Sequence, residues 1–244
     1  MWTKETIEKH IDASRLLEQI KNRILIFIKN NPNTNEKNIS DFILEQFKKN
    51  NLKSDKDPPI VAFNLNTDRP HYNPSLEPKN LEDNTLILLD IWANLKIPKS
   101  PFADMTWMAY KGESIPEEIK NVFNIVIAAR DKCLDFLKEE LKKGKIPTGK
   151  QVDDIARNFI KESGFEGKFL HTTGHSLGNS YVHGIYKGIS QRNPSPLVKN
   201  LGYTIEPGIY LQDKFGIRSE LDFYINDNLE LIITTPIQKE IDLI

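Results

Sequence analysis

Cysteine is nearly absent from this 244-residue chain: Cys133 is the only one, so no internal disulfide can form. Because disulfides persist in oxidising compartments, we expect a protein of a reducing one, and cytoplasmic localisation. No run of about 18 apolar residues is present, which argues against a membrane-spanning helix. The N-terminal residues carry charges throughout and lack the apolar core of a signal peptide.

An excess of charge of one sign is also missing. Lys and Arg number 33 and Asp and Glu number 34, so the formal net charge is -1. No overall field would attract nucleic acid or an anionic membrane, and we expect neither as a partner. Hydrophobic residues make up 39% of the chain and charged residues 27%, as in ordinary globular proteins. Neither a repeat nor a linker is evident, which predicts one domain over residues 1–244.

Hydrophobic periodicity predicts helices over residues 3–30 and 35–50, then a polar surface loop over 50–59. Alternating or strongly apolar runs predict strands over 61–66, 85–95 and 103–110, and the last two should pair as a hairpin. From residue 169 to the end the pattern is one of strands and loops.

Two more helices are predicted between the hairpin and residue 169. The first spans 115–142, with a capping box formed by Ser114 and Glu117, Pro116 in the first turn and Gly144 just past the end. The second begins at Thr148, capped reciprocally by Gln151, and stops before Gly164.

Each strand of the predicted hairpin carries one aspartate, Asp90 or Asp104, in an otherwise apolar run. An unpaired buried carboxylate costs several kcal/mol or is forced to protonate. A single such residue would favour a salt bridge or a strand-end cap, whereas two in neighbouring strands indicate a cation. Thr106 shares a strand face with Asp104 and could support a ligand.

Three of the five histidines, His171, His175 and His183, fall within residues 171–183. HTTGH is not the zincin helix motif, because it has no glutamate after the first histidine and Thr-Thr-Gly is poor helix sequence. Gly174 and Gly178 flank His175 and permit close backbone approach.

Two glutamates follow in strand-like runs. Glu206 precedes the turn pair Pro207-Gly208, and Glu220 lies two residues after Arg218, on the same strand face. Arg218 and Glu220 could form a same-strand ion pair, or Glu220 could be a metal ligand with Arg218 supporting it. One imidazole together with carboxylates suits a borderline-hard divalent cation better than a cysteine-rich zinc site.

Six motifs, in this order, resemble the pita-bread metallopeptidases, which include methionine aminopeptidase, Xaa-Pro aminopeptidase and prolidase: PHYNP, LLDIWA, ADMT, HTTGHSLG…VHG, YTIEPGIY and GIRSE. The resemblance covers roughly residues 5–235, and the EPGIY and Arg-x-Glu forms look more like the Xaa-Pro branch. It implies an α+β fold, a curved and mostly antiparallel sheet covered by helices. It also implies an exopeptidase that cleaves Xaa-Pro peptides with a water bridging two metal ions.

Carried over by resemblance, the metal ligands would be Asp90, Asp104, His175, Glu206 and Glu220. Asp104 and Glu220 would bridge the two ions, and Glu206 could also shuttle a proton. His71 and His183 match histidines that contact substrate, and His171 matches the first histidine of the H-x-x-G/S-H segment. Thr106 and Arg218 would support the ligands. Mn or Co is expected, and Fe or Zn is compatible with the same set.

The departures from the family pattern leave alternatives open. The spacing from His175 to His183 is eight residues, one more than usual, so a bulge could re-aim His183. The N-terminal domain of full-length Xaa-Pro enzymes has no counterpart in this sequence. Because that domain shapes substrate access and oligomerisation in those enzymes, the sequence leaves open how substrate enters and whether the chain forms a homodimer. Prolidase, which would need a cation such as Lys187 or Arg192 for the substrate carboxylate, and methionine aminopeptidase are the enzymatic alternatives. A pita-bread domain without catalytic activity, acting as a binding module, is the non-enzymatic alternative. Inactive relatives typically lose metal ligands, whereas this chain keeps all five. His10 has no assigned role.

Overall fold

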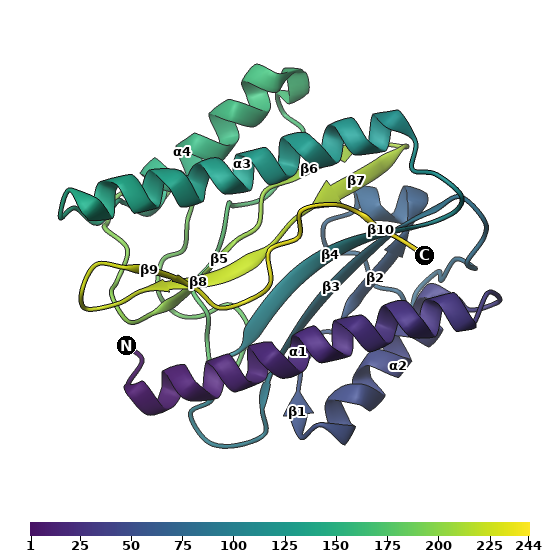
Figure 1. Ribbon diagram of the computed structural model, residues 1–244, viewed down its shortest axis with the longest axis horizontal. Coiled ribbons are helices and arrows are strands. Elements are labelled where there is room, and N and C mark those ends of the chain that lie inside the picture. The colour runs from purple at the N-terminus through teal and green to yellow at the C-terminus, as the bar shows by residue number, and fades with distance from the viewer.

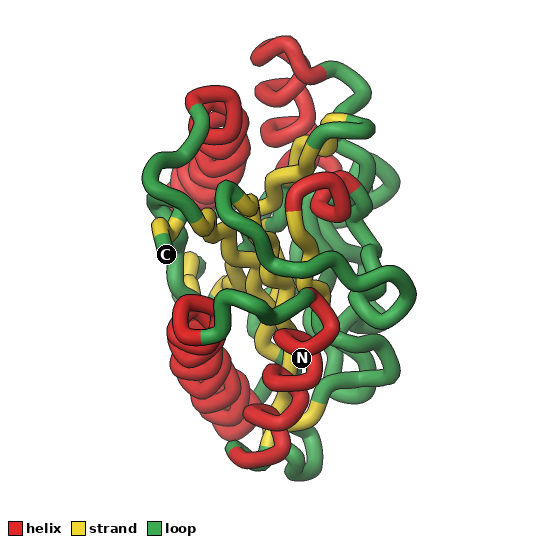
Figure 2. The backbone as a smooth tube through the Cα atoms, turned by 90° about the vertical axis from the view of Figure 1, so that its right-hand side faces the viewer, coloured by secondary structure: helices red, strands yellow, loops and turns green.

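Two pairs of helices flank a set of twisted strands in the computed structural model, which describes residues 1–244 (Figure 1). Helices α1 (Lys4–Asn30) and α2 (Glu36–Lys49) form one pair, and α3 (Glu117–Lys142) and α4 (Gly149–Ile160) form the other. Turned by 90°, the molecule shows long helices on one side of the strands and loops gathered on the other (Figure 2). None of the helices combines the length and apolarity needed to cross a membrane.

The largest sheet is built on β3 (Thr85–Leu95) and β4 (Ala103–Lys111), which pair antiparallel as predicted. The short strands β1 (Leu52–Lys53) and β2 (Ile60–Phe63) pair with β3, and β10 (Asp242–Leu243) runs parallel to β4. A second sheet has the order β5-β8-β9, with bounds Gly202–Ile205, Leu221–Ile225 and Leu231–Ile233. Strands β6 (Gly208–Leu211) and β7 (Phe215–Arg218) form a separate hairpin.

The register of β3 and β4 decides which side chains reach the site. Asp90 lies opposite Thr106, and Trp92 lies opposite Asp104. Because side chains alternate along a strand and paired residues share a face, these four project from one face of the hairpin. The intervening residues of both strands, such as Leu89, pack in the core beneath α1 and α2. The two aspartates therefore point away from those helices.

Two segments that precede β3 differ from the sequence predictions. The strand predicted over 61–66 stops at Phe63, and a 3-10 helix follows over Asn64–Asp68. Asn64 takes a positive φ of 44° and its side chain accepts a hydrogen bond from the backbone N–H of Leu86, which ends the ladder. The loop predicted over 50–59 contains the two-residue strand β1.

The start of α3 was also predicted wrongly. The helix begins at Glu117, and its N-cap is Pro116, which has no side-chain oxygen to cap a backbone N–H. Ser114 therefore lies two positions too early to form a capping box. The reciprocal Thr148–Gln151 capping box at α4 is confirmed, and Gly144 lies just past the end of α3 with a φ of 75°.

His10, which has no role by sequence, is a buried link between α1 and the rest of the chain. Its Nδ1 lies 2.9 Å from the carbonyl oxygen of Phe102, and its Nε2 lies 2.7 Å from the hydroxyl of Thr234. Burial lowers the pKa of His10 to about 4, so the ring is neutral near pH 7. His10 belongs to the packing of the fold.

Candidate functional site

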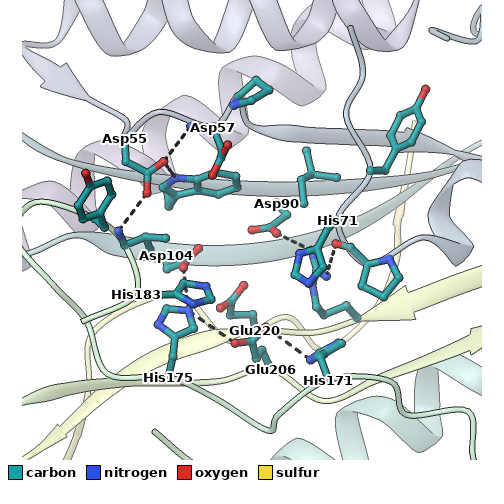
Figure 3. Close-up of a pocket in the computed structure, with 18 of the residues that line it drawn as sticks. Asp55, Asp57, His71, Asp90, Asp104, His171, His175, His183, Glu206 and Glu220 are labelled. Carbon is teal, nitrogen blue, oxygen red and sulfur yellow. Dashed lines mark hydrogen bonds and ion pairs between the residues drawn. The ribbon is translucent and has the colours of Figure 1, made fainter. Parts of the chain in front are cut away.

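A cavity of about 910 Å³ opens on the face of the β3–β4 hairpin that carries the aspartates (Figure 3). It gathers nine of the ten residues that the sequence singled out: Asp90, Asp104, His175, Glu206, Glu220, His71, His171, His183 and Arg218. The tenth, Thr106, lies behind Glu220 and donates a hydrogen bond of 2.8 Å to its Oε2. The predicted site residues thus converge, although they come from positions as far apart in the chain as His71 and Glu220.

The tightest cluster within the cavity consists of Asp104, His175 and Glu220, whose potential ligand atoms all lie within 4.8 Å of one another. Nε2 of His175 lies 3.5 Å from Oδ2 of Asp104 and 3.6 Å from Oε1 of Glu206. Oδ1 of Asp104 is buried and accepts no hydrogen bond. A buried, unpartnered carboxylate oxygen beside an imidazole and further carboxylates is a donor set that suits a divalent cation.

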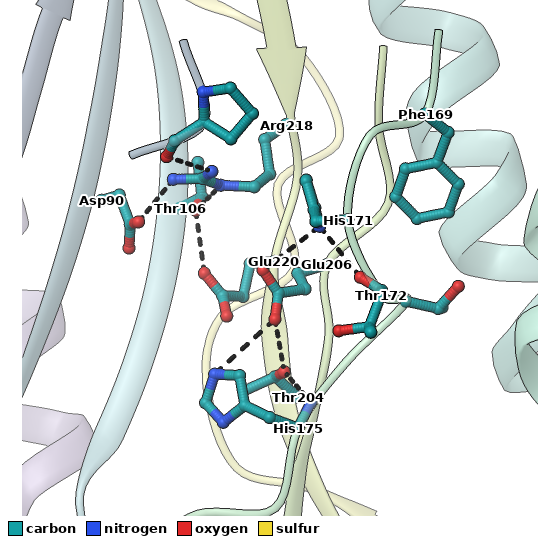
Figure 4. Close-up of polar contacts among 12 residues, drawn as sticks. Asp90, Thr106, Phe169, His171, Thr172, His175, Thr204, Glu206, Arg218 and Glu220 are labelled. Atoms are coloured by element: carbon teal, nitrogen blue, oxygen red, sulfur yellow. Dashed lines mark hydrogen bonds and ion pairs between the residues drawn. The ribbon is translucent and has the colours of Figure 1, made fainter. Parts of the chain in front are cut away.

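Asp90 lies on the same wall but is engaged by Arg218, whose Nη2 contacts Oδ2 of the aspartate (Figure 4). Nε of Arg218 donates to Oγ1 of Thr106 at 2.9 Å, and Thr106 in turn donates to Glu220. The guanidinium therefore connects the Asp90 side of the site to Glu220 through Thr106. The alternative of a direct ion pair between Arg218 and Glu220 is wrong, because the cation of Arg218 pairs with Asp90.

The pKa values of four carboxylates in the cavity are shifted by burial and by their charged neighbours. Burial, reinforced by neighbouring carboxylates, raises the pKa of Asp104 and of Glu220 well above the ordinary range. Burial also raises the pKa of Asp90, although Arg218 opposes it. For Glu206, burial acts in the same direction, but the surrounding His175, His171 and Arg218 outweigh it and lower the pKa. Such a site favours a cation, which would offset the repulsion between the carboxylates.

His183 stacks on His175, with ring centroids 4.0 Å apart and planes inclined by 19°. The chain between them folds back in a tight turn, in which Leu177 bridges to His183 and the N–H of Gly178 donates to the carbonyl of Val182. A Cβ at position 178 would lie 2.3 Å from the carbonyl oxygen of Tyr181, so only glycine fits. This turn lies within the eight-residue spacing between His175 and His183, which is one residue longer than the family pattern. His183 nevertheless faces the cavity. Burial lowers the pKa of His183 to about 4.

His171 lies on the far side of Glu206, with Nδ1 3.8 Å from Oε2. Its Nε2 is 2.7 Å from the hydroxyl of Tyr210, which also accepts a hydrogen bond of 3.2 Å from Nη1 of Arg218. Sequence reasoning missed Tyr210. The one available signal was Gly216, which pairs with Tyr210 across the β6–β7 hairpin and whose missing side chain leaves room for the ring.

Helix α4 fixes the backbone of the segment that carries His171. Asp153 is buried and accepts hydrogen bonds from the N–H and the hydroxyl of Thr173 at 3.1 and 2.9 Å. Arg157, one turn later, pairs with Asp153 and donates to the carbonyl oxygen of His171 at 2.9 Å. An ion pair on a helix thus positions a site loop that has no regular secondary structure of its own.

Residues 55–58, part of the segment predicted as a surface loop, return to the rim of the cavity. Oδ1 of Asp55 accepts from Nε1 of Trp92 at 2.9 Å, and Oδ2 accepts from the N–H of Val182 at 3.1 Å. The exposed Lys56 follows directly and lines the cavity. Lys187 and Arg192, the cations favoured from sequence, do not line it, which corrects that prediction.

Comparisons with known proteins find similar sequences over most of this chain. The chain matches metallopeptidase family M24 over residues 8–227. Curated relatives include an uncharacterized peptidase of Bacillus subtilis, 28% identical over 232 residues, which are 95% of this chain and 61% of the relative. Another, from Staphylococcus epidermidis, is 29% identical over 199 residues, 82% of this chain and 53% of the relative. This chain therefore spans between about half and three fifths of the length of these relatives.

Solved structures match the whole chain. The X-Pro aminopeptidase from Thermotoga maritima is 31% identical, with a TM-score of 0.87 over 100% of this chain and 64% of that one. The prolidase from Thermococcus sibiricus is 27% identical, with a TM-score of 0.86 over 100% of this chain and 62% of that one. These matches confirm the predicted α+β pita-bread fold.

Proposed function

Because this chain belongs to metallopeptidase family M24, we propose that it is a metal-dependent exopeptidase that removes the N-terminal residue from Xaa-Pro peptides. The observation that carries the proposal is the convergence of Asp104, His175 and Glu220 in one cavity, within 4.8 Å of one another. Similarity to the X-Pro aminopeptidase of Thermotoga maritima supports the substrate class. Residues 1–244 would act as one catalytic domain.

We propose a pair of divalent cations as the cofactor. The residues that would hold them are the five predicted ligands, Asp90, Asp104, His175, Glu206 and Glu220, and the unpartnered oxygen of Asp104 fits this role. Mn or Co is expected foremost, and the donor set also accepts Fe or Zn. When bound, such cations supply a water of lowered pKa and stabilise the charge that develops on the scissile carbonyl oxygen.

The protein's own residues would handle protons and orientation. Glu206, whose pKa is lowered by His175, His171 and Arg218 against the effect of burial, is ionised at neutral pH and would carry a proton from water to the leaving nitrogen. His183, with a pKa of about 4, is neutral there and would hydrogen-bond the peptide rather than pair with a charge. His71 on the opposite wall would contact the substrate from the other side.

A peptide panel tests this proposal on metal-stripped protein. We expect Xaa-Pro-Xaa peptides to be cleaved only after Mn or Co is restored, because the carboxylates alone cannot acidify a water. Release of the N-terminal residue and the bound metal would be measured by chromatography and elemental analysis. Preference for Met-Ala-type peptides would instead indicate a methionine aminopeptidase. Protein that binds metal and peptide without cleaving any of the panel would indicate a binding module and overturn the proposal.

One observation favours prolidase as the second candidate. Besides Arg218, which is engaged with Asp90, the only lysine or arginine that lines the cavity is Lys56. No ion pair involves Lys56, although Asp55 and Asp57 flank it. Because a dipeptidase must hold the carboxylate of its substrate, Lys56 is the candidate for that contact.

Replacing Lys56 with methionine tests this alternative. If Lys56 holds the substrate carboxylate, kcat/KM for Xaa-Pro should fall by about fivefold, the effect of one solvent-exposed ion pair. The same substitution should leave hydrolysis of the Xaa-Pro amide unchanged, because the amide has no carboxylate. Arg192→Met, at an exposed site outside the cavity, is the matched control. Equal effects of Lys56→Met on acid and amide would exclude this role.

A further inference from the structure

Glu36, in the first turn of α2, is a fully buried carboxylate outside the cavity, with no ion-pair partner. Its Oε1 accepts from the N–H of Phe63 at 2.6 Å and from Nδ2 of Asn66 at 3.0 Å. Its Oε2 accepts from the hydroxyl of Tyr72 at 2.6 Å and the N–H of Lys79 at 2.7 Å. All four donors belong to one stretch of chain, residues 63–79.

Residues 63–79 form a wall of the cavity. Pro70, His71 and Tyr72 line it, and the carbonyl oxygen of Pro70 accepts a hydrogen bond of 3.1 Å from Nη1 of Arg218. Beyond the 3-10 helix this wall has no regular secondary structure up to residue 79. Few backbone hydrogen bonds within it can therefore hold His71 in place, and Glu36 supplies external ones.

The groups around Glu36 are hydrogen-bond donors, which suits a carboxylate with two acceptor oxygens. A charged acceptor makes stronger hydrogen bonds than a neutral one, and its place at a helix N-terminus favours negative charge. Gln has one acceptor oxygen, and its amide group would point donors at groups that are themselves donors. Because Gln has an acceptor oxygen on only one side, the substitution would leave the N–H of Phe63 or that of Lys79 without its acceptor, which a buried site tolerates poorly.

We propose that Glu36 is a positioning residue for the peptidase reaction: its carboxylate fixes residues 63–79, and through Tyr72 it holds the adjacent His71 against the cavity. The inference rests on the proposed function, since it takes His71 to contact substrate. It also makes a structural claim about residues 63–79 that does not depend on activity.

Glu36→Gln tests both parts. We expect kcat/KM for an Xaa-Pro-Xaa peptide to fall by about 10²-fold, the loss that a misplacement of about 1 Å can cause. Metal content should stay unchanged, because no proposed ligand is touched. Hydrogen exchange followed by mass spectrometry on the metal-free protein should show faster exchange in residues 63–79. The matched control is Glu45→Gln on the exposed face of the same helix, where Glu45 pairs only with Lys49.

A double-mutant cycle with His71→Ala separates positioning from general damage to the fold. If Glu36 acts through His71, Glu36→Gln should lower kcat/KM by no more than about twofold further in the His71→Ala background. Should Glu36→Gln fail to fold, Tyr72→Phe removes one donor and should shift activity and exchange in the same direction with a smaller size.

Parent-like exchange in residues 63–79 of Glu36→Gln would overturn the proposal, as would losses that simply multiply in the cycle. If the parent protein itself cleaves no peptide, the proposed function fails. The exchange data would still decide whether Glu36 fixes the wall.

Discussion

Replacing Glu220 with alanine is expected to lower kcat/KM for Xaa-Pro-Xaa peptides by at least about 10³-fold, since a metal site contributes several kcal/mol to transition-state stabilisation. The carboxylate of Glu220 lies close to the potential ligand atoms of Asp104 and His175 and accepts a hydrogen bond from Thr106. Without it a shared cation would lose an anchor that no neighbouring side chain replaces. Asp104→Ala should have an effect of the same size. Steady-state kinetics with saturating metal, together with elemental analysis, would measure both.

A stability measurement separates ligand loss from unfolding. Burial and neighbouring carboxylates raise the pKa of Glu220 well above its unfolded value, so in the absence of metal its ionisation opposes folding at neutral pH. Metal-free Glu220→Gln should therefore unfold at a higher temperature than the metal-free parent, and this gain should vanish below the unfolded pKa. Glu166→Ala, at an exposed ion pair with Lys161, is the control. Near-normal turnover by Glu220→Ala would refute the proposed site.

Arg218→Met should destabilise the metal-free protein by about 3–5 kcal/mol, as expected when one partner of a buried ion pair is removed. Only 3% of the Arg218 side chain and 12% of the Asp90 side chain are exposed. Loss of the guanidinium would leave the Asp90 carboxylate without its cation. It would also remove the hydrogen bonds that Arg218 donates to the hydroxyl of Tyr210 and to the carbonyl of Pro70. Urea denaturation of the metal-free protein would measure the free energy of unfolding.

The double variant Asp90→Asn with Arg218→Met checks the cause. Because it removes both charges, it should be more stable than Arg218→Met alone. Arg192→Met, at an exposed arginine, should change the free energy of unfolding by no more than about 0.5 kcal/mol. Parent-like stability of Arg218→Met would mean that the pair contributes nothing to folding.

The parts of the site that sequence predicted best lie on regular strands. A single aspartate in each of two apolar runs marked Asp90 and Asp104, and strand alternation put Thr106 on the face of Asp104. The β3–β4 register explains this success, because both aspartates share one face of the hairpin. Their roles as metal ligands stay predictions.

Residues held by distant contacts were missed, for a physical reason. Asp55 sits in a polar stretch that looks solvated, and it is held at the cavity rim by hydrogen bonds from Trp92 and Val182, both distant in the chain. Glu36 looked like an ordinary polar position in an amphipathic helix, and its burial depends on residues 63–79 folding over it. Lys187 and Arg192 were favoured because they follow His183 closely, but nearness in sequence does not decide which way a loop turns.

The cluster at the centre of the cavity spans a boundary between sheets. Asp104 belongs to β4 in one sheet, while Glu220 directly precedes β8 in the other. A cation bound by Asp104 and Glu220 together would link the two sheets. Unfolding of either sheet would then release the cation. The stability of the folded chain would then depend on the concentration of free metal. Removing the metal with a chelator would increase the unfolded fraction, which proteases cleave.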